Sequence, residues 1–207
     1  LKPRGGRRSA ERLPSLSTFS ALRRALRSPD SKRNGNQKPQ RDRGKTWRQR
    51  CSVRITYSAG RVAGHFAAHG RYLMRESAAG ETGLFGALEN ESLPDALDRW
   101  QKSGDKRLWK MIVSPEFGHR INLRDLTTRL VGAIEQDFRT QFEWAAVEHH
   151  NTDHPHVHVV LRAVDRAGVE LRFPPEYLKS AIRAHAEDLC TAQIGHRTQE
   201  DVQLALQ

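Results

Sequence analysis

Half of the chain's ten histidines fall between positions 149 and 158, in the run HHNTDHPHVH. His156 and His158 are two residues apart in a stretch, HVHVVLR, that alternates like a β-strand. On a strand, residues two apart point to the same face, with their Cα atoms about 6–7 Å from each other. Two imidazoles in that arrangement can share one metal ion. The spacing therefore predicts a metal site.

A third ligand is expected from the strand that precedes this one, since the short NTDHP connection predicts an antiparallel hairpin. His149 and His150 are adjacent, so they point to opposite faces and only one of them can join the pair. The spacing favours His149, but the turn geometry leaves the choice open. Asp153 and His154 lie in the turn, where they are predicted to orient a ligand from outside the metal's own shell. Three imidazoles suit Mn²⁺ or Zn²⁺, and Mg²⁺ is acceptable when phosphate oxygens complete the shell.

The chain has three tyrosines that could act as nucleophiles, Tyr57, Tyr72 and Tyr177. Tyr72 shares one helical face with polar residues at intervals of three and four, namely His65, His69 and Glu76. Tyr57 alternates within a predicted strand and is expected to pack there. Tyr177 begins the last predicted helix. An aromatic on an amphipathic helix usually packs in the core, and the polar neighbours of Tyr72 weaken that expectation, but these residues alone leave the choice of nucleophile open.

The segments HHNTDHPHVHVVLR and HGRYLMRES together resemble the HUH endonucleases, and specifically the relaxases, or mobilization nucleases, of conjugative plasmids. Among these, the Ti-plasmid border-nicking type is the most similar, and WKMIVSPEFG (109–118) also resembles a strand of those proteins. In relaxases the nucleophilic tyrosine precedes the HxH motif. In rolling-circle initiators and single-tyrosine transposases it follows. The resemblance therefore implies Tyr72 as nucleophile, His149 as third ligand and Asp153 in the acidic position of the turn.

The activity implied by the resemblance is nicking of single-stranded DNA at a transfer origin through a reversible 5′-phosphotyrosine bond. Mg²⁺ or Mn²⁺ is the expected cofactor. A tyrosine in water ionises only near pH ~10, so activation by the metal or by Arg71 and Arg75 is expected. His69 and Glu76 are candidates for proton transfer. The residues expected to hold DNA are Arg71, Arg75, Arg162, Arg166 and Arg172. Expected partners are accessory relaxosome proteins and a type IV secretion coupling protein.

Three other functions remain open from the sequence. The first is a metal-dependent phosphodiesterase that uses water, and the second is a replication-type or transposase-type HUH nuclease that uses Tyr177. The third is a non-catalytic, basic module that binds single-stranded DNA.

The elements that must position these residues read as an α+β fold, an antiparallel sheet with helices packed on its faces. Predicted strands cover 51–58, 108–115, 142–150, 156–164 and 169–173, and predicted helices cover 61–77, 123–138 and 175–194. Residues 80–105 look like a surface insertion with a short helix that begins near Pro94.

Charge is distributed unevenly along the chain. Residues 1–50 hold 16 basic and 3 acidic side chains, a net charge of +13, whereas the remaining residues hold 19 and 21, a net charge of −2. Residues 1–47 are therefore predicted to be a basic, disordered tail suited to phosphate contact, and 48–207 a folded nuclease domain. No apolar run is long enough to span a membrane. The two cysteines and the absence of a secretion leader favour a cytoplasmic setting, and Leu as first residue suggests an excerpt of a longer protein.

Overall fold

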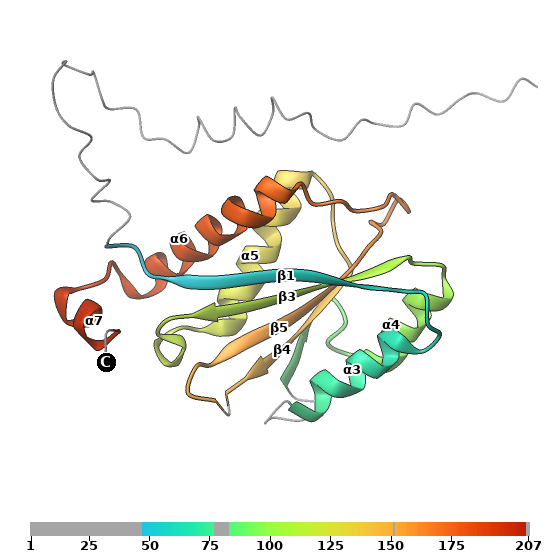
Figure 1. The fold of residues 1–207 in the computed structure, drawn as a ribbon, viewed down its shortest axis with the longest axis horizontal. Helices are drawn as coiled ribbons and strands as arrows, with labels where there is room; N and C mark the ends of the chain where they lie inside the picture. Colours follow the sequence, from blue (N-terminus) through green and yellow to red (C-terminus); the bar gives the residue numbers. More distant parts are fainter. Residues whose placement is uncertain (1–46, 77–82, 151, 206–207) are drawn as a thin grey trace, which may run out of the picture. The chain divides into compact units, whose positions relative to one another are not determined.

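The structure is a computed structural model that describes residues 47–76, 83–150 and 152–205. The predicted basic tail, apart from Trp47, lies outside the described residues. The Trp47 carbonyl accepts a hydrogen bond of 2.6 Å from the backbone N–H of Arg197. The folded unit begins with a long strand and ends with a short helix (Figure 1).

One five-stranded sheet forms the centre of this unit. Its order is β1-β3-β5-β4-β2, and every neighbouring pair is antiparallel. The strands are β1 (Cys51–Ala59), β2 (Leu84–Gly86), β3 (Arg107–Pro115), β4 (Trp144–His149) and β5 (His156–Arg162). The predicted α+β fold and the β4–β5 hairpin are confirmed.

The helices cover the sheet from both faces (Figure 1). On one face lie α3 (His65–Glu76) and α4 (Leu93–Lys102), which contact each other. On the other face lie α5 (Leu123–Phe138) and α6 (Ile182–Ile194), of which α6 packs against β1. Short elements are the 3-10 turn Gly118–Arg120 and α7 (Gln199–Leu204).

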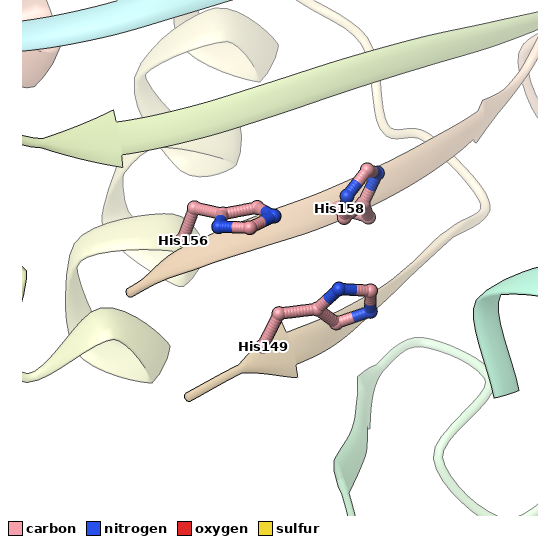
Figure 2. Close-up of side chains that lie close together, drawn as sticks. All are labelled: His149, His156 and His158. Atoms are coloured by element: carbon pink, nitrogen blue, oxygen red, sulfur yellow. The ribbon is translucent and has the colours of Figure 1, made fainter. Parts of the chain in front are cut away.

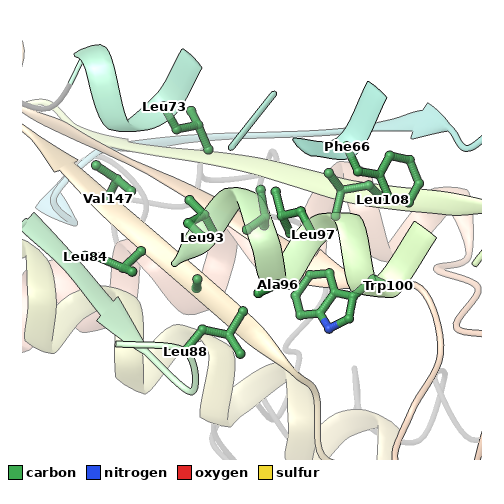
Figure 3. Close-up of a cluster of buried hydrophobic side chains, with 12 residues drawn as sticks. Phe66, Leu73, Leu84, Leu88, Leu93, Ala96, Leu97, Trp100, Leu108 and Val147 are labelled. Atoms are coloured by element: carbon green, nitrogen blue, oxygen red, sulfur yellow. The ribbon is translucent and has the colours of Figure 1, made fainter. Parts of the chain in front are cut away.

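The core beneath α3 and α4 is built from large apolar side chains (Figure 3). In α4, Leu93, Leu97 and Trp100 follow helical spacing and are at most 1% exposed. The short helix predicted near Pro94 is confirmed as α4, but the prediction that residues 80–105 form a surface insertion was wrong. That segment supplies the edge strand β2 and the core helix α4. The apolar stripe of α4 is buried because it packs against α3 and the sheet.

Other elements differ from prediction at their ends. Helix α3 begins four residues later than predicted, after Gly64, whose φ of +73° is a turn conformation that L side chains rarely adopt. The predicted strand at 169–173 is reduced to a single bridge between Val164 and Glu170. The last predicted helix is present, and it opens with a π-helical turn over Tyr177–Ala181.

Candidate metal centre

The β4–β5 hairpin brings three histidines to one face of the sheet (Figure 2). His149 and His156 are directly opposite each other in the register, and Val147 is opposite His158. Because side chains alternate along a strand, His149, His156 and His158 share a face. This is the face on which α3 and α4 pack, since Val147 belongs to their core cluster.

The three imidazoles are close enough to hold one ion together. One ring nitrogen from each residue lies within 4.8 Å of the others. Ring centroids are 4.6 Å apart for His149–His158, 5.1 Å for His156–His158 and 5.3 Å for His149–His156. Metal–imidazole bonds of about 2.0–2.1 Å leave ligand nitrogens roughly 3–4 Å apart, so small side-chain rotations would close the site.

The third member of the cluster is His149 and not His150. His149 is 6% exposed and faces the HxH pair. His150 follows the end of β4, is largely exposed, and its Nε2 is 3.9 Å from a carboxylate oxygen of Glu148. Strand alternation left His149 and His150 as two choices in the sequence. The register of the hairpin places His149 with the pair.

The turn between the strands orients His156. Its Nδ1 lies 2.9 Å from the backbone carbonyl of His154, which also accepts a hydrogen bond from the Thr152 hydroxyl at 2.8 Å. A proton on Nδ1 leaves Nε2 of His156 as the lone-pair nitrogen for a metal. The contact to His156 comes from the backbone of His154, and the side chains of Asp153 and His154 are exposed in the turn, so their predicted orienting roles stay predictions.

Burial and neighbouring imidazoles keep His158 neutral. Desolvation, followed by the charges of His149, His156 and His69, lowers its pKa from 6.5 to about 4. A neutral imidazole is the form that binds metal. Since His69 lies on α3, the electrostatic influence of His69 on His158 also links that helix to the histidine cluster.

Tyr72 lies on the accessible side of α3. It is 44% exposed, whereas its neighbour Leu73 is 1% exposed and packs in the core. The ring of Tyr72 is nearly parallel to that of His69, with centroids 6.2 Å apart. Burial, then Lys110 and His65, lowers the pKa of His69 to about 4. The chain thus presents a tyrosine hydroxyl beside a neutral histidine that interacts with the cluster.

Tyr177 has a different environment. It is 4% exposed, and its hydroxyl donates a 2.7 Å hydrogen bond to Asp137, which also lies 2.9 Å from Nε2 of His185. Burial and the Asp137 carboxylate raise the pKa of Tyr177 well above its usual range. Its ring packs on Phe138 of α5, in the layer on the other face of the sheet.

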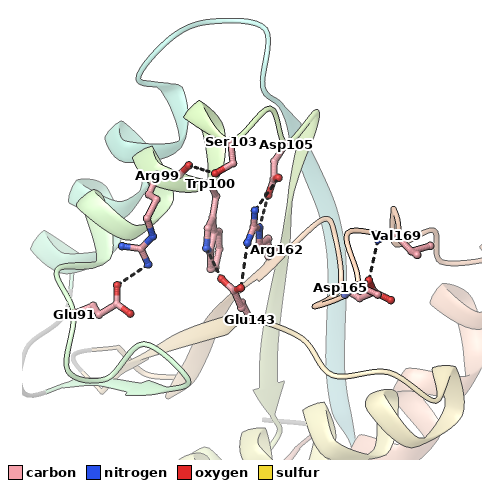
Figure 4. Close-up of polar contacts among 10 residues, drawn as sticks. Glu91, Arg99, Trp100, Ser103, Asp105, Glu143, Arg162, Asp165 and Val169 are labelled. Atoms are coloured by element: carbon pink, nitrogen blue, oxygen red, sulfur yellow. Dashed lines mark hydrogen bonds and ion pairs between the residues drawn. The ribbon is translucent and has the colours of Figure 1, made fainter.

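The five arginines expected at DNA divide into two groups. Arg71 and Arg75 are exposed on α3 beside Tyr72. Arg162 is at the end of β5 remote from His156, where its guanidinium is 2.9 Å from Asp105 and 3.1 Å from Glu143 (Figure 4).

The other two arginines lie beyond that end of β5. Arg172 is 2.8 Å from Glu170. Arg166 lines a pocket of about 390 Å³ with Arg162 and Trp100. Arg71 and Arg75 thus lie on the helix that carries Tyr72, whereas Arg162 lies at the end of β5 remote from His156.

Three residues of the open sheet surface were missed by sequence reasoning. Lys110 acts on His69, Ile112 is opposite His158, and Arg54 is opposite Ile112. Their alternation within the strands was visible in the sequence. The pairing of β3 with both β1 and β5, which sets them beside the histidines, was not.

The hairpin's turn is held by a close approach of backbone. A Cβ on Gly118 would stand 2.6 Å from the carbonyl oxygen of Pro155, so this contact requires glycine.

Among the described residues, no helix is long and apolar enough to cross a membrane.

Together, the antiparallel α+β sheet and its cluster of three histidines define a domain of the HUH nuclease type. A family model, described as the nuclease domain of MobA/VirD2-like relaxases, matches residues 90–193, half of the chain. The chain therefore belongs to the MobA/VirD2-like relaxases, and its activity is DNA nicking by a relaxase-type nuclease. The match includes all three histidines but not α3, which carries Tyr72. A comparison with curated proteins found no match.

Proposed function

We propose that this relaxase cuts one DNA strand at a transfer origin by direct attack of Tyr72 and later rejoins it, thereby initiating conjugative transfer of a plasmid. The observation that carries the proposal is the position of Tyr72, exposed on α3 and stacked beside His69, which lies near enough to His158 to contribute to its lowered pKa. A nucleophile and a metal-ligand cluster on one face of the sheet are the parts that a phosphoryl transfer needs.

The reaction balances as a transesterification. The Tyr72 hydroxyl oxygen forms a bond to phosphorus while the bond from phosphorus to the 3′ oxygen breaks. The tyrosine loses its proton, and the departing 3′ oxygen gains one. The DNA is left joined to the protein by a 5′-phosphotyrosine, and the reverse attack by the 3′ hydroxyl restores the strand.

His149, His156 and His158 fit a divalent metal, because all three offer a ring nitrogen within 4.8 Å of the others. When bound, Mg²⁺ or Mn²⁺ supplies Lewis-acid polarisation of the phosphate, and Zn²⁺ is a further candidate for imidazole ligands. The His154 carbonyl keeps His156 oriented. Asp153, in the same turn, is proposed to assist from outside the ligand set.

The groups around Tyr72 are assigned to charge and proton handling. Arg71 and Arg75, both exposed, neutralise DNA phosphates and favour the phenolate. His69 is neutral at physiological pH and accepts the phenol proton. Glu76 is the second candidate for that role; it ends α3, and its side chain lies outside the described residues.

The alternative that uses Tyr177 has little geometric support. Tyr177 is 4% exposed and its hydroxyl donates to Asp137, so this hydroxyl is both poorly accessible and hard to ionise. Its pKa is raised, whereas a nucleophile needs a lowered one.

An adduct assay separates the remaining candidates. Labelled single-stranded DNA bearing the transfer origin is incubated with the protein and Mn²⁺ or Mg²⁺, and SDS-stable adducts are resolved on a gel. We expect an adduct with the wild type and with Tyr57→Phe, a matched control that is 56% exposed on β1. Tyr72→Phe should form none. Cleavage without an adduct would favour attack by water, and binding without cleavage would favour a non-catalytic module.

The setting follows from the proposed activity. Accessory relaxosome proteins would melt the origin, and a type IV secretion coupling protein would receive the nucleoprotein, both in the cytoplasm. Residues 48–207 would form the nuclease domain. The basic residues 1–47 would add sequence-independent phosphate contacts.

A further inference from the structure

A second concentration of positive charge lies two strands away from the histidines. It is a groove of about 480 Å³ next to the start of β1 and to α6, and three of its lining residues are arginines: Arg48, Arg50 and Arg183. The first two precede β1 and the third is in the first turn of α6. Among the described lining residues, Glu187 is the acidic one.

The arginines of this groove are only partly neutralised. Arg50 is 66% exposed and its Nη1 is 3.6 Å from Glu116, a carboxylate that the buried Arg197 contacts more closely, at 3.0 Å. Arg48 pairs with Asp188 at 2.9 Å at the surface. Arg183 is exposed. Exposed ion pairs of this kind are weak, so a phosphate can replace the carboxylates at small cost.

At Ser52, the groove reaches the face of the sheet that carries the histidines. In the sheet register, His158 is opposite Ile112, and Ile112 is opposite Arg54 on β1. Two strand spacings separate His158 from Arg54, which is about 10 Å. Arg54 and Ser52 are exposed on β1, the edge strand, and Ser52 also lines the groove.

We infer that the groove formed by Arg48, Arg50 and Arg183 binds backbone phosphates of the same DNA strand whose scissile phosphate lies at the histidines. Arg54 bridges the two places. This inference rests on the proposed function, and it adds a path: the strand crosses β3 and β1 and passes over the outer edge of the sheet toward α6. The groove recognises phosphate charge and not base identity, because the cationic groups that line it are guanidinium donors, which suit phosphate oxygens.

The test is the salt dependence of DNA binding, measured by fluorescence anisotropy on oligo(dT) of about 20 nucleotides, longer than common single-strand site sizes. All proteins carry Tyr72→Phe, and EDTA is present, so that binding is read without nicking. For single strands, the slope of log K against log salt changes by about 0.7 for each phosphate contact. Arg50→Ala with Arg183→Ala should therefore lower the slope by about 1 to 1.5, and Arg54→Ala by about 0.7.

The matched control removes two charges from another exposed region. Arg129→Ala with Arg139→Gly does this at α5, where Arg129 is 53% exposed and 3.7 Å from Asp125. Arg139 has a φ of +51°, which glycine accepts readily. This control should keep the slope of the parent protein. The inference would be overturned if both double variants lowered the salt slope equally, or if the groove variant did not lower it. Adduct formation by the wild type is scored separately, so failure of the nicking proposal would be recognised independently.

Discussion

At the scale of single residues, the site depends on three imidazoles held on two paired strands. His158 is central to it, because it is close to both other histidines and its pKa is held near 4 by burial and by their charges. The hydrogen bond from His156 to the His154 carbonyl adds orientation. The candidate ligands of the cluster are therefore ring nitrogens.

Removal of one ligand should abolish tight metal binding. His158→Ala is expected to weaken Mn²⁺ affinity by on the order of 100-fold or more, since even changes outside the ligand set cost 10–100-fold. Isothermal titration calorimetry measures this directly. His150→Ala is the control, because that exposed imidazole faces away, toward Glu148. Equal losses in the two variants would contradict the assigned ligand set.

The lowered pKa values predict a pH dependence of stability in the metal-free protein. His158 and His69 each have a folded pKa of about 4 and a usual value of 6.5. Protonation therefore favours the unfolded chain, so the contribution is fully present above pH 6.5 and is lost as pH falls toward 4. Urea midpoints in EDTA should fall over that window. The midpoints should fall less in His158→Gln. If the midpoint of that variant depended on pH as steeply as that of the wild type, the lowered pKa assigned to His158 would be refuted.

At the scale of elements, the site is supported by the layer of α3 and α4. Helix α3 presents Tyr72 and His69, and its position depends on α4 beneath it, through side chains such as Leu97. Gly70 is part of this contact, because a Cβ there would lie 3.0 Å from the backbone of Pro94. A loss of packing in α4 should therefore affect both stability and the presentation of Tyr72.

Leu97→Ala tests this support. Leu97 is 0% exposed, and truncation of a buried leucine typically costs about 2–5 kcal/mol. Chemical denaturation of the metal-free protein measures the change. Arg99→Ala is the comparison on the same helix, where an exposed pair with Glu91 should contribute less than about 1 kcal/mol. Similar effects for both would indicate that α4 is a surface element after all.

The elements with strong local patterns could be predicted from sequence. The spacing of Leu126, Leu130 and Ile134 indicated a helix whose observed bounds, Leu123–Phe138, agree with the prediction. The HxH alternation and the short turn likewise indicated β5 and its hairpin. In each case the spacing of apolar residues within one segment is enough to predict the element.

The remaining elements depend on contacts between distant segments. Three residues of β2 form a strand only because β4 is there to pair with them. The ion pair of Arg162 with Asp105 joins positions 57 apart, and so a residue predicted to hold DNA proves to be engaged within the protein. Register across strands also decided between His149 and His150, which a single strand leaves ambiguous.

At the scale of the whole molecule, charge and chemistry are separated along the chain. The first 50 residues carry a net charge of +13, while the rest carries −2. On the proposed function, the domain would rely on local groups, such as Arg71 and Arg75 beside Tyr72, to attract DNA. The N-terminal residues would supply a general attraction that is screened by salt.

Deletion of residues 1–46 should separate these contributions. The cut keeps Trp47, whose carbonyl bonds to the Arg197 N–H. We expect weaker binding of oligo(dT) and a smaller salt slope, with the urea midpoint unchanged, because no contact of the described fold is removed. An unchanged slope would mean that the N-terminal residues do not contact DNA.

The central claim, attack by Tyr72, is tested most directly by mapping the covalent adduct. After nicking, nuclease treatment leaves a short 5′-phosphorylated nucleotide on the protein, and trypsin cuts after Arg71 and Arg75. Mass spectrometry should then find the nucleotide on the peptide Tyr72-Leu-Met-Arg75. A nucleotide on the peptide that contains Tyr177, or cleaved DNA with no modified peptide, would contradict the account.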